Sequence, residues 1–286
     1  MLFATLADAT SYVRFESLGL NKVALDLGFF QLRWYSLAYL AGIMLAYWYL
    51  LKLIKEPGSP FSRDNADDMI FYGTLGVILG GRLGYVLFYQ PSILKNPMDI
   101  FKVWEGGMSL HGGTIGVLLG LAYFAWRNKK SFLRAVDYIA VTVGFGLLFG
   151  RLANFVNGEL WGRATDVSWA IIFPTGGDVP RHPSQLYEAG LEGVLMLIIM
   201  YFMFWKTDAR YKTGLLTGVA ALIYGCSRFF VEYYRQPDKG LEDLSWGLTM
   251  GQTLSVPMIV LGLYLVLTAN KRKVAKEAQP AVEAEA

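Results

Sequence analysis

The feature that most constrains the fold is a series of long apolar runs along a chain of 286 residues. A bilayer core is crossed by about 20 apolar residues in a helix, because only a helix satisfies its own backbone hydrogen bonds in lipid. With 54% hydrophobic and 17% charged residues, the composition also fits a membrane protein better than a soluble domain. We therefore predict an all-α polytopic membrane protein with seven transmembrane helices, at about 33–54, 68–90, 108–126, 135–157, 185–205, 213–233 and 247–269.

Lysine and arginine indicate the orientation of these helices. They are dense in alternate connections, at 52–63, 127–134, 206–212 and 271–276, and sparser in the others. Because basic residues favour the cytoplasmic side, the C-terminus is predicted to be cytoplasmic and the N-terminus periplasmic. The predicted organisation is a single seven-helix membrane domain over residues 1–270, followed by a disordered cytoplasmic tail at 271–286.

Two segments on the periplasmic side are predicted to carry structure of their own. Residues 158–184 form a small periplasmic cap, since the stretch VSWAIIFP is typical of extended structure and Gly176-Gly177 of a turn. Residues 1–32 form a periplasmic arm that lies at the interface, with Phe29 and Phe30 as an aromatic anchor. The single cysteine, Cys226, excludes an internal disulfide. The sequence also lacks a cluster of histidine and cysteine that would indicate a metal site, so no cofactor is expected.

Three arginines interrupt the apolar runs, namely Arg82, Arg151 and Arg228. A charged side chain at the centre of a spanning helix costs roughly 2.5–3.5 kcal/mol, so a compensating group is needed. A bound anion such as a phospholipid headgroup would compensate all three. Arg228 has an alternative partner in Glu232, four residues on, and this pair predicts either an internal salt bridge or part of a site. Arg151 has only Glu159 nearby, eight residues on.

The predicted topology places the costly polar groups at one depth, in the outer half of the membrane. His111 lies at the start of its helix beside two glycines, which makes it a candidate proton acceptor. A packing role for this histidine is the alternative. The polar residues that share this depth are Tyr35, Arg82, His111, Arg151, Asn154, Asn157, Gln185, Tyr187, Glu188, Arg228 and Glu232.

One long motif makes the chain recognisable. The segment GRLANFVNGELWGR at 150–163 resembles the signature of the bacterial prolipoprotein diacylglyceryl transferases, with Ala153 where glycine is expected in many members. Further segments resemble that family in the same order, so the resemblance covers nearly the whole chain. They are RWYSLAYL (33–40), GGRLGYVLFY (80–89), WEGGMSLHGGTIG (104–116), HPSQLYE (182–188) and SRFFVEYYRQPD (227–238).

The resemblance implies a transferase of the bacterial inner membrane. Such an enzyme moves the diacylglyceryl group of phosphatidylglycerol onto the lipobox cysteine thiol of a preprolipoprotein, forms a thioether and releases glycerol phosphate. It works at the outer leaflet of the lipid bilayer, with no cofactor, metal or nucleic acid.

On this interpretation, each intramembrane residue has its own role in the reaction. Arg151 and Arg228 hold the phosphate, because a guanidinium makes bidentate contact with it. His111 takes the thiol proton; alternatively, an arginine alone stabilises the thiolate and His111 only orients a neighbour. The remaining candidates support substrate binding: Asn154 and Tyr35 by hydrogen bonds, Glu232 by orienting Arg228, Glu159 and Gly162 by shaping the cap, and Arg82 by supporting the site or guiding the lipid.

Two other functions are compatible with intramembrane arginines. An anion or lipid transporter would use Arg151 and Arg228 along its pathway, but the sequence shows neither an internal repeat nor polar groups at the midplane. A lipid-binding assembly factor would hold headgroups without chemistry. A transfer assay with phosphatidylglycerol and a lipobox peptide distinguishes the enzyme from both.

Overall fold

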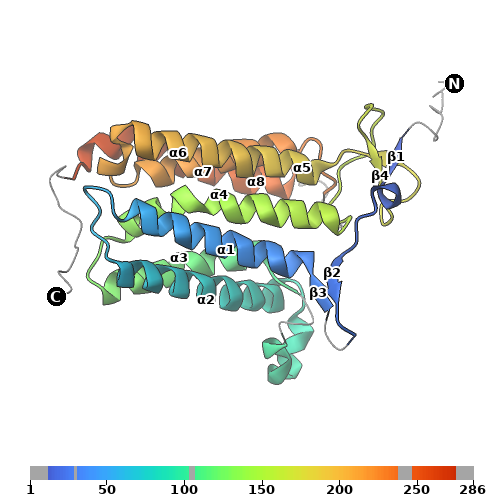
Figure 1. Ribbon diagram of the computed structural model, residues 1–286, viewed down its shortest axis with the longest axis horizontal. Helices are drawn as coiled ribbons and strands as arrows, with labels where there is room; N and C mark the ends of the chain where they lie inside the picture. The colour runs from blue at the N-terminus through green and yellow to red at the C-terminus, as the bar shows by residue number, and fades with distance from the viewer. Residues whose placement is uncertain (1–11, 29–30, 103–106, 238–246, 275–286) are drawn as a thin grey trace. The chain divides into compact units, whose positions relative to one another are not determined.

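The protein is helical throughout most of its length in a computed structural model, which describes residues 12–28, 31–102, 107–237 and 247–274 (Figure 1). The chain forms two compact units. Unit 1 comprises residues 1–46, 140–209 and 215–268, and unit 2 comprises residues 47–139, 210–214 and 269–286. The prediction of a single membrane domain stays a prediction.

Each predicted apolar run contains a helix. These helices are α1 (Trp34–Leu53), α2 (Arg63–Phe88), α3 (Leu110–Arg127), α4 (Phe132–Val156), α7 (Leu215–Val231), α8 (Met250–Thr268) and a composite of α5 (Ser184–Glu188), the π-helix η5 (Ala189–Leu195) and α6 (Met196–Lys206). Within the described ranges, α1, α2, α4, the composite helix and the segment Met250–Lys271 are long and apolar enough to cross a membrane. The apolar helix α7 is shorter, with 17 residues. A helical membrane protein is therefore confirmed, and the count of seven spans stays a prediction.

Unit 2 is built around the pair α2 and α3, whose backbones touch. A Cβ atom placed on Gly116 would lie 2.0 Å from the carbonyl oxygen of Gly76, and one on Gly80 would lie 2.3 Å from that of Gly112. Both distances are far below van der Waals contact, so the glycines that recur every four residues allow the close approach expected of them. Ser62 caps the start of α2 in a capping box with Asn65, and Ser109 caps α3.

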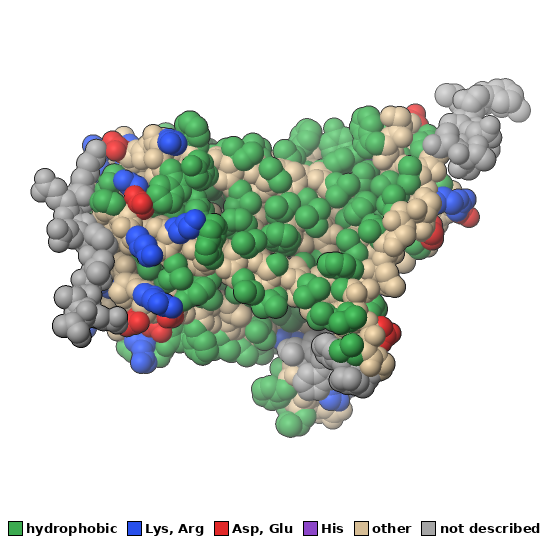
Figure 2. All heavy atoms as spheres, in the orientation of Figure 1, with side chains coloured by type: hydrophobic (Ala, Val, Ile, Leu, Met, Phe, Trp, Pro, Cys, Tyr) green, Lys and Arg blue, Asp and Glu red, His purple; other side chains and the backbone are tan. Residues whose placement is uncertain are grey.

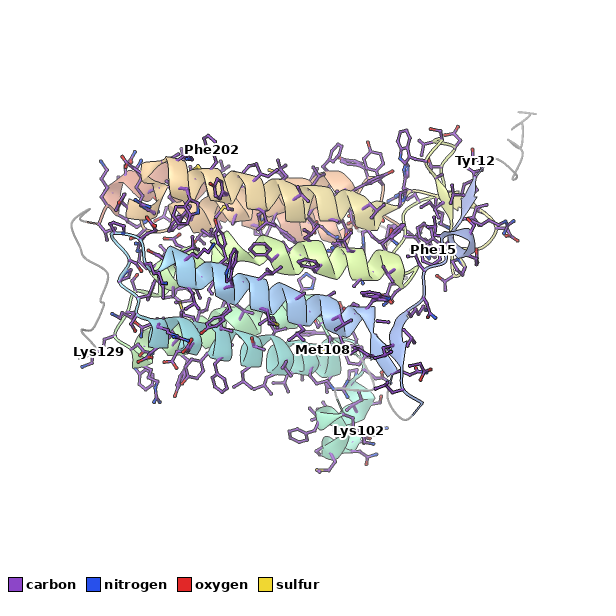
Figure 3. The ribbon with its side chains drawn as sticks, viewed as in Figure 1. Tyr12, Phe15, Lys102, Met108, Lys129 and Phe202 are labelled. Atoms are coloured by element: carbon purple, nitrogen blue, oxygen red, sulfur yellow. The ribbon has the colours of Figure 1, made fainter. Side chains whose placement is uncertain are left out.

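The basic connections of unit 2 meet at one end of its helices. Arg134 donates to the carbonyl oxygens of Gly58, at 2.9 Å, and Arg210, at 2.6 Å. The guanidinium of Arg210 pairs with Glu56 at 2.8 Å. Figure 2 shows lysine and arginine side chains gathered where α1 ends and α2 begins, and Lys129 marks the same end in Figure 3. Segments predicted to share one side of a membrane therefore lie together.

The beginning of the predicted tail is held in this arrangement. Arg272 Nε donates to the carbonyl oxygen of Thr213 at 2.8 Å, and Val274 N donates to that of Tyr211 at 2.8 Å. Residues 271–274 are thus ordered against the 211–213 segment, contrary to the predicted start of disorder at 271. Residues 275–286 lie outside the described residues, so for them disorder stays a prediction.

Unit 1 adds two small sheets to its helices. Strand β4 (Ile171–Ile172) pairs in parallel with β1 (Val13–Arg14) and antiparallel with β5 (Pro180–Arg181), while β2 (Val23–Asp26) and β3 (Gln31–Arg33) form a hairpin. Of the extended structure predicted in 167–174, strand β4 confirms residues 171 and 172. Gly177, with φ of +77°, forms the turn toward β5, as predicted. The expected anchor, Phe29 and Phe30, lies outside the described residues.

A small aromatic core holds the larger sheet together. Phe15 and Phe173 pack with ring centroids 5.6 Å apart, and both rings also contact Phe155 at the end of α4 (Figure 3 labels Phe15). Ile171 and Trp161 complete this cluster. The end of α4, which carries the long sequence motif, is therefore packed against the strands of the predicted cap.

Candidate active site

Unit 1 contains a buried ionic cluster made of three arginines and three glutamates. They come from α4, the composite helix, α7 and the turn after α7, segments that are distant in the sequence. The members are Arg151, Glu188, Glu192, Arg228, Glu232 and Arg235.

Arg151 is paired with two carboxylates of the composite helix. Its Nε lies 2.7 Å from Glu188 Oε2, and its Nη2 lies 3.3 Å from Glu192 Oε2. The sequence did not reveal these acids as partners, because they follow Arg151 by about 40 residues and only the helix packing brings them close. The two glutamates thus supply part of the negative charge that compensates Arg151, which was expected to come from a bound anion.

Arg228 bridges two acids in the same cluster. Its Nη1 lies 3.0 Å from Glu188 Oε1, and its Nη2 lies 3.2 Å from Glu232 Oε2. The predicted pair of Arg228 and Glu232 is therefore confirmed. Arg235 joins from the turn after α7, with its Nε 3.6 Å from Glu188 Oε1. The sequence places Arg235 in the connection after the sixth predicted span, and nothing in it indicates that the turn folds back toward Glu188.

The acids of this cluster lie deeper than the arginines. The side chains of Glu188, Glu192 and Glu232 are 2%, 0% and 3% exposed, whereas those of Arg151 and Arg228 are each 13% exposed. Buried carboxylates must be paired, because an unpaired buried charge is costly. The part of the cluster that stays accessible therefore belongs mainly to the guanidinium groups, which suits an incoming anion.

Glu159 holds the end of α4 instead of pairing with Arg151. Its carboxylate accepts hydrogen bonds from Asn154 Nδ2 at 2.9 Å and Asn157 Nδ2 at 3.2 Å, and its carbonyl oxygen accepts one from Gln185 Nε2 at 2.6 Å. These contacts tie the last turn of α4 to the first turn of α5. The Nδ2 group of Asn154 therefore already has a hydrogen-bond acceptor within the protein.

Gly162 lies where the chain segment after α4 meets the turn after α7. Its amide donates to the carbonyl oxygen of His182 at 2.8 Å, and it forms an antiparallel bridge with Arg235. A Cβ atom here would lie 2.5 Å from the carbonyl oxygen of Tyr234. Only glycine allows this approach, which sets the position of Arg235 and of the residues that lead into α5.

An open aromatic groove of about 570 Å³ adjoins the cluster in sequence, because Tyr187 and Tyr234 precede Glu188 and Arg235. The hydroxyl of Tyr187 accepts from Trp169 Nε1 at 2.7 Å and lies 3.1 Å from His182 Nδ1. Burial lowers the pKa of His182, so this imidazole favours its neutral form. Val167, Leu186, Gly190, Leu191 and Phe230 complete the lining.

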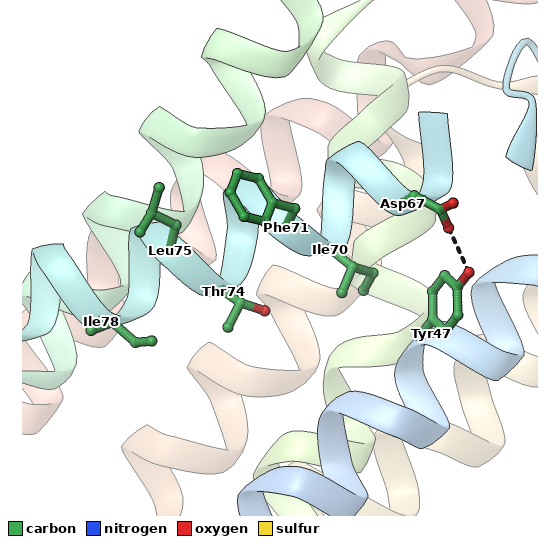
Figure 4. Close-up of a pocket in the computed structure, with 7 residues that line it drawn as sticks. All are labelled: Tyr47, Asp67, Ile70, Phe71, Thr74, Leu75 and Ile78. Atoms are coloured by element: carbon green, nitrogen blue, oxygen red, sulfur yellow. Dashed lines mark hydrogen bonds between the residues drawn. The ribbon is translucent and has the colours of Figure 1, made fainter. Parts of the chain in front are cut away.

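A second groove, of about 480 Å³, lies in unit 2 and contains none of the predicted site residues (Figure 4). The Tyr47 hydroxyl donates to the Asp67 carboxylate at one end of it, and apolar side chains of α2 form most of its lining. An apolar groove of this kind suits hydrocarbon, so we assign it no part in the chemistry.

Of the other predicted residues, Tyr35 lies within electrostatic reach of Arg151 and Glu159, whereas Arg82 and His111 belong to unit 2. Tyr35, in the first turn of α1, has its hydroxyl 3.2 Å from that of Tyr39. His111 belongs to unit 2, where it is an exposed residue in the first turn of α3. Arg82 also belongs to unit 2 and is buried.

Arg82 contacts the connection between α2 and α3. Its Nε donates to the carbonyl oxygen of Ile100 at 2.8 Å, its Nη2 to that of Asp99 at 2.7 Å, and its Nη1 to that of Gly107 at 3.4 Å. The buried guanidinium thus satisfies backbone acceptors on both sides of residues 103–106. In the ranges that the structure describes, no group of histidine, cysteine and acidic side chains could hold a metal ion.

Comparison with known proteins identifies the family. The family model described as prolipoprotein diacylglyceryl transferase matches residues 22–268. The chain belongs to this family. Two relatives named phosphatidylglycerol--prolipoprotein diacylglyceryl transferase support the assignment. The protein from Erythrobacter litoralis is 57% identical over 94% of this chain and 96% of its own length, and that from Zymomonas mobilis is 52% identical over 96% and 99%.

The family match includes the whole ionic cluster and most of both units. Residues 22–268 contain the six members of the cluster together with Tyr35, Arg82 and His111. The family resemblance inferred from the sequence motifs is confirmed.

Proposed function

We propose that this chain transfers the diacylglyceryl group of phosphatidylglycerol to the lipobox cysteine of preprolipoproteins. The names of the relatives support this reaction over anion transport. The structural observation that supports it best is the ionic cluster, in which buried glutamates hold arginines with a partly accessible edge. Such an edge can bind the single negative charge of a phosphodiester.

In the proposed reaction, Arg151 and Arg228 bind the phosphate of the lipid. The cysteine thiolate attacks the glyceryl carbon that carries the phosphate, a C–S bond forms, and the C–O bond to the phosphate breaks. The electron pair of the C–O bond leaves with glycerol phosphate, which gains a second negative charge. The arginines lower the barrier because their contact with the phosphate strengthens as this charge develops.

The thiol must lose its proton for this attack, because the thiolate is the nucleophile. We propose His111 as the base that accepts this proton, since it is exposed and close to the start of α3. The alternative is that an arginine stabilises the thiolate and His111 orients a neighbour. Tyr35 and Asn154 are proposed to contact the lipid, and Glu232 to orient Arg228 through the 3.2 Å ion pair.

Glu159 and Gly162 are proposed to act through the backbone around the site. Glu159 fixes the end of α4, and Gly162 fixes the approach of Arg235. Arg82 is proposed to act in the same indirect way: its contacts with Asp99, Ile100 and Gly107 hold the connection that leads to His111. Guidance of the lipid by Arg82 remains an alternative.

We further propose a bacterial inner-membrane location with seven spans, a periplasmic N-terminus and a cytoplasmic C-terminus. The grouping of the basic connections at one end of unit 2 supports a cytoplasmic position for that end. The arm and the cap, residues 1–32 and 158–184, would then be periplasmic, on the side where preprolipoproteins emerge.

The deciding experiment uses purified protein, phosphatidylglycerol and a lipobox peptide, followed by mass spectrometry of the peptide. We expect a mass increase of one diacylglyceryl unit on cysteine. Arg228→Lys should lose transfer, because an ammonium makes no bidentate contact. Arg210→Lys is the matched control, since Arg210 also pairs with a glutamate but lies in unit 2. Anion flux into liposomes without peptide modification would contradict the proposal.

A further inference from the structure

Glu188 is the only acid among the described residues that contacts all three arginines of the cluster. Its Oε2 accepts from Arg151 at 2.7 Å, and its Oε1 lies 3.0 Å from Arg228 and 3.6 Å from Arg235. By contrast, Glu192 pairs with Arg151 alone in the part of the chain that the structure describes. One carboxylate thus joins residues from α4, α7 and the turn after α7.

Glu188 is also firmly placed. It is the last residue of α5 and its side chain is 2% exposed. The first turn of α5 is fixed by Gln185, which donates to the carbonyl oxygen of Glu159 at 2.6 Å, and by Ser184, which donates to that of Leu160 at 3.1 Å. The same segment of chain that ends α4 therefore sets the position of the carboxylate.

The helix changes its geometry directly after Glu188. Residues Ala189–Leu195 form a π-helix, and Glu192 lies within it. Single π-turns inside α-helices are rare and occur frequently at functional sites, because they redirect side chains that a regular helix would place elsewhere. The irregular turn belongs to the segment that presents both acids to Arg151.

We infer that Glu188 is a positioning residue for the transfer reaction, one that holds the guanidinium groups of Arg151 and Arg228 at a set separation. This inference rests on the proposed function. With both guanidinium groups bound to opposite oxygens of one carboxylate, their accessible edges face the phosphate site together. The lipid then needs no rearrangement of the arginines as charge develops on the departing phosphate.

A loss of Glu188 would affect turnover more than binding. Glu188→Gln removes one negative charge beside three arginines, so the site still attracts an anionic lipid. The arginines would lose their common anchor, and a misplacement of about 1 Å can cost on the order of 100-fold in rate. We therefore expect kcat to fall on the order of 100-fold while the KM for phosphatidylglycerol stays equal or falls. General unfolding of the site would raise KM instead.

The experiment measures kcat and KM for phosphatidylglycerol in detergent micelles with a lipobox peptide. Glu56→Gln is the matched control: Glu56 pairs with Arg210 at 2.8 Å in unit 2, and its loss should leave both constants unchanged. A wild-type enzyme that modifies no peptide would refute the proposed function itself. If the wild type is active, two results for Glu188→Gln would overturn the positioning role. They are wild-type activity and an increase in KM with unchanged kcat.

A second variant keeps the inference testable if Glu188→Gln does not fold. Glu188→Asp retains the charge but shortens the side chain by one methylene group, so the carboxylate can no longer reach all three arginines. We expect this variant to melt near the wild-type temperature and to lose kcat without an increase in KM. Wild-type kcat in Glu188→Asp would overturn the inference.

Discussion

Substitution of Gly162 by alanine tests whether backbone packing near the ionic cluster controls activity. The added Cβ atom would lie 2.5 Å from the carbonyl oxygen of Tyr234 and 2.7 Å from both the Cβ and the carbonyl oxygen of His182, whereas ordinary contact begins at 3.4 Å. One side of this contact must therefore move by about 0.9 Å, because protein interiors have no space to absorb the difference.

The movement reaches the site whichever side yields. A shift at Tyr234 displaces Arg235, which pairs with Glu188, and a shift at His182 displaces the start of α5. Overpacking of this kind costs about 1–3 kcal/mol in the free energy of unfolding. Because a displacement of about 1 Å can cost on the order of 100-fold in rate, we expect diacylglyceryl transfer to fall by that amount.

The assay is the initial rate of peptide modification, measured together with thermal unfolding in detergent. Gly73→Ala in α2 is the matched control, since a Cβ atom there meets no atom within 4 Å. That substitution should leave the rate unchanged and, as a replacement of glycine inside a helix, raise stability by up to about 1 kcal/mol. Wild-type transfer by Gly162→Ala would refute the argument that this close approach positions the site.

Four further predictions address individual residues. Arg151→Lys should lower kcat roughly 10- to 100-fold, because each lost charge-assisted hydrogen bond is worth about 1.5–3 kcal/mol; full activity would show that a point charge suffices. Arg82→Gln should reduce the free energy of unfolding by about 2–4 kcal/mol, since the carbonyl oxygens of residues 99 and 100 lose their donor; an unchanged melting curve would contradict this. His111→Asn should lower transfer at least about 100-fold, the smallest contribution typical of a general base; a smaller loss would assign this histidine a structural role. Burial lowers the pKa of His182 in the folded protein, so the unfolded chain binds a proton first as pH falls, and stability is lost below the unfolded pKa; His182→Gln should flatten the fall in melting temperature between about pH 7 and pH 5, and an equally steep fall would contradict the assignment.

Sequence reasoning worked best where the relevant interaction is local. The helix positions follow from apolar runs, and the pairing of Arg228 with Glu232 follows from their spacing of four residues. Extended structure was predicted for 167–174 from its composition, and the strand covers residues 171–172 of it. In each case the physical cause lies within a few residues of the feature that it explains.

The candidate site was only partly predictable for the same reason. The predicted topology put Glu188 at the depth of the arginines, but its pairing with them depends on how the composite helix packs beside α4 and α7. Arg235 resembles a loop charge until the close approach at Gly162 is known. Likewise, the role of Arg82 stayed open between support of the site and guidance of the lipid, because the carbonyl oxygens that it binds carry no sequence signal. Backbone acceptors and charges distant along the chain are visible only in three dimensions.

The amino-acid sequence by itself determined that this chain is a helical membrane protein of the diacylglyceryl transferase family with arginines in costly positions. The length of the apolar runs indicates spanning helices, because it matches the thickness of a bilayer. The series of motifs in the same order indicates the family. Only the tertiary structure decided how the cost of Arg151 and Arg228 is met. Three buried glutamates, brought together from distant segments, pair with the arginines, whose side chains stay partly exposed.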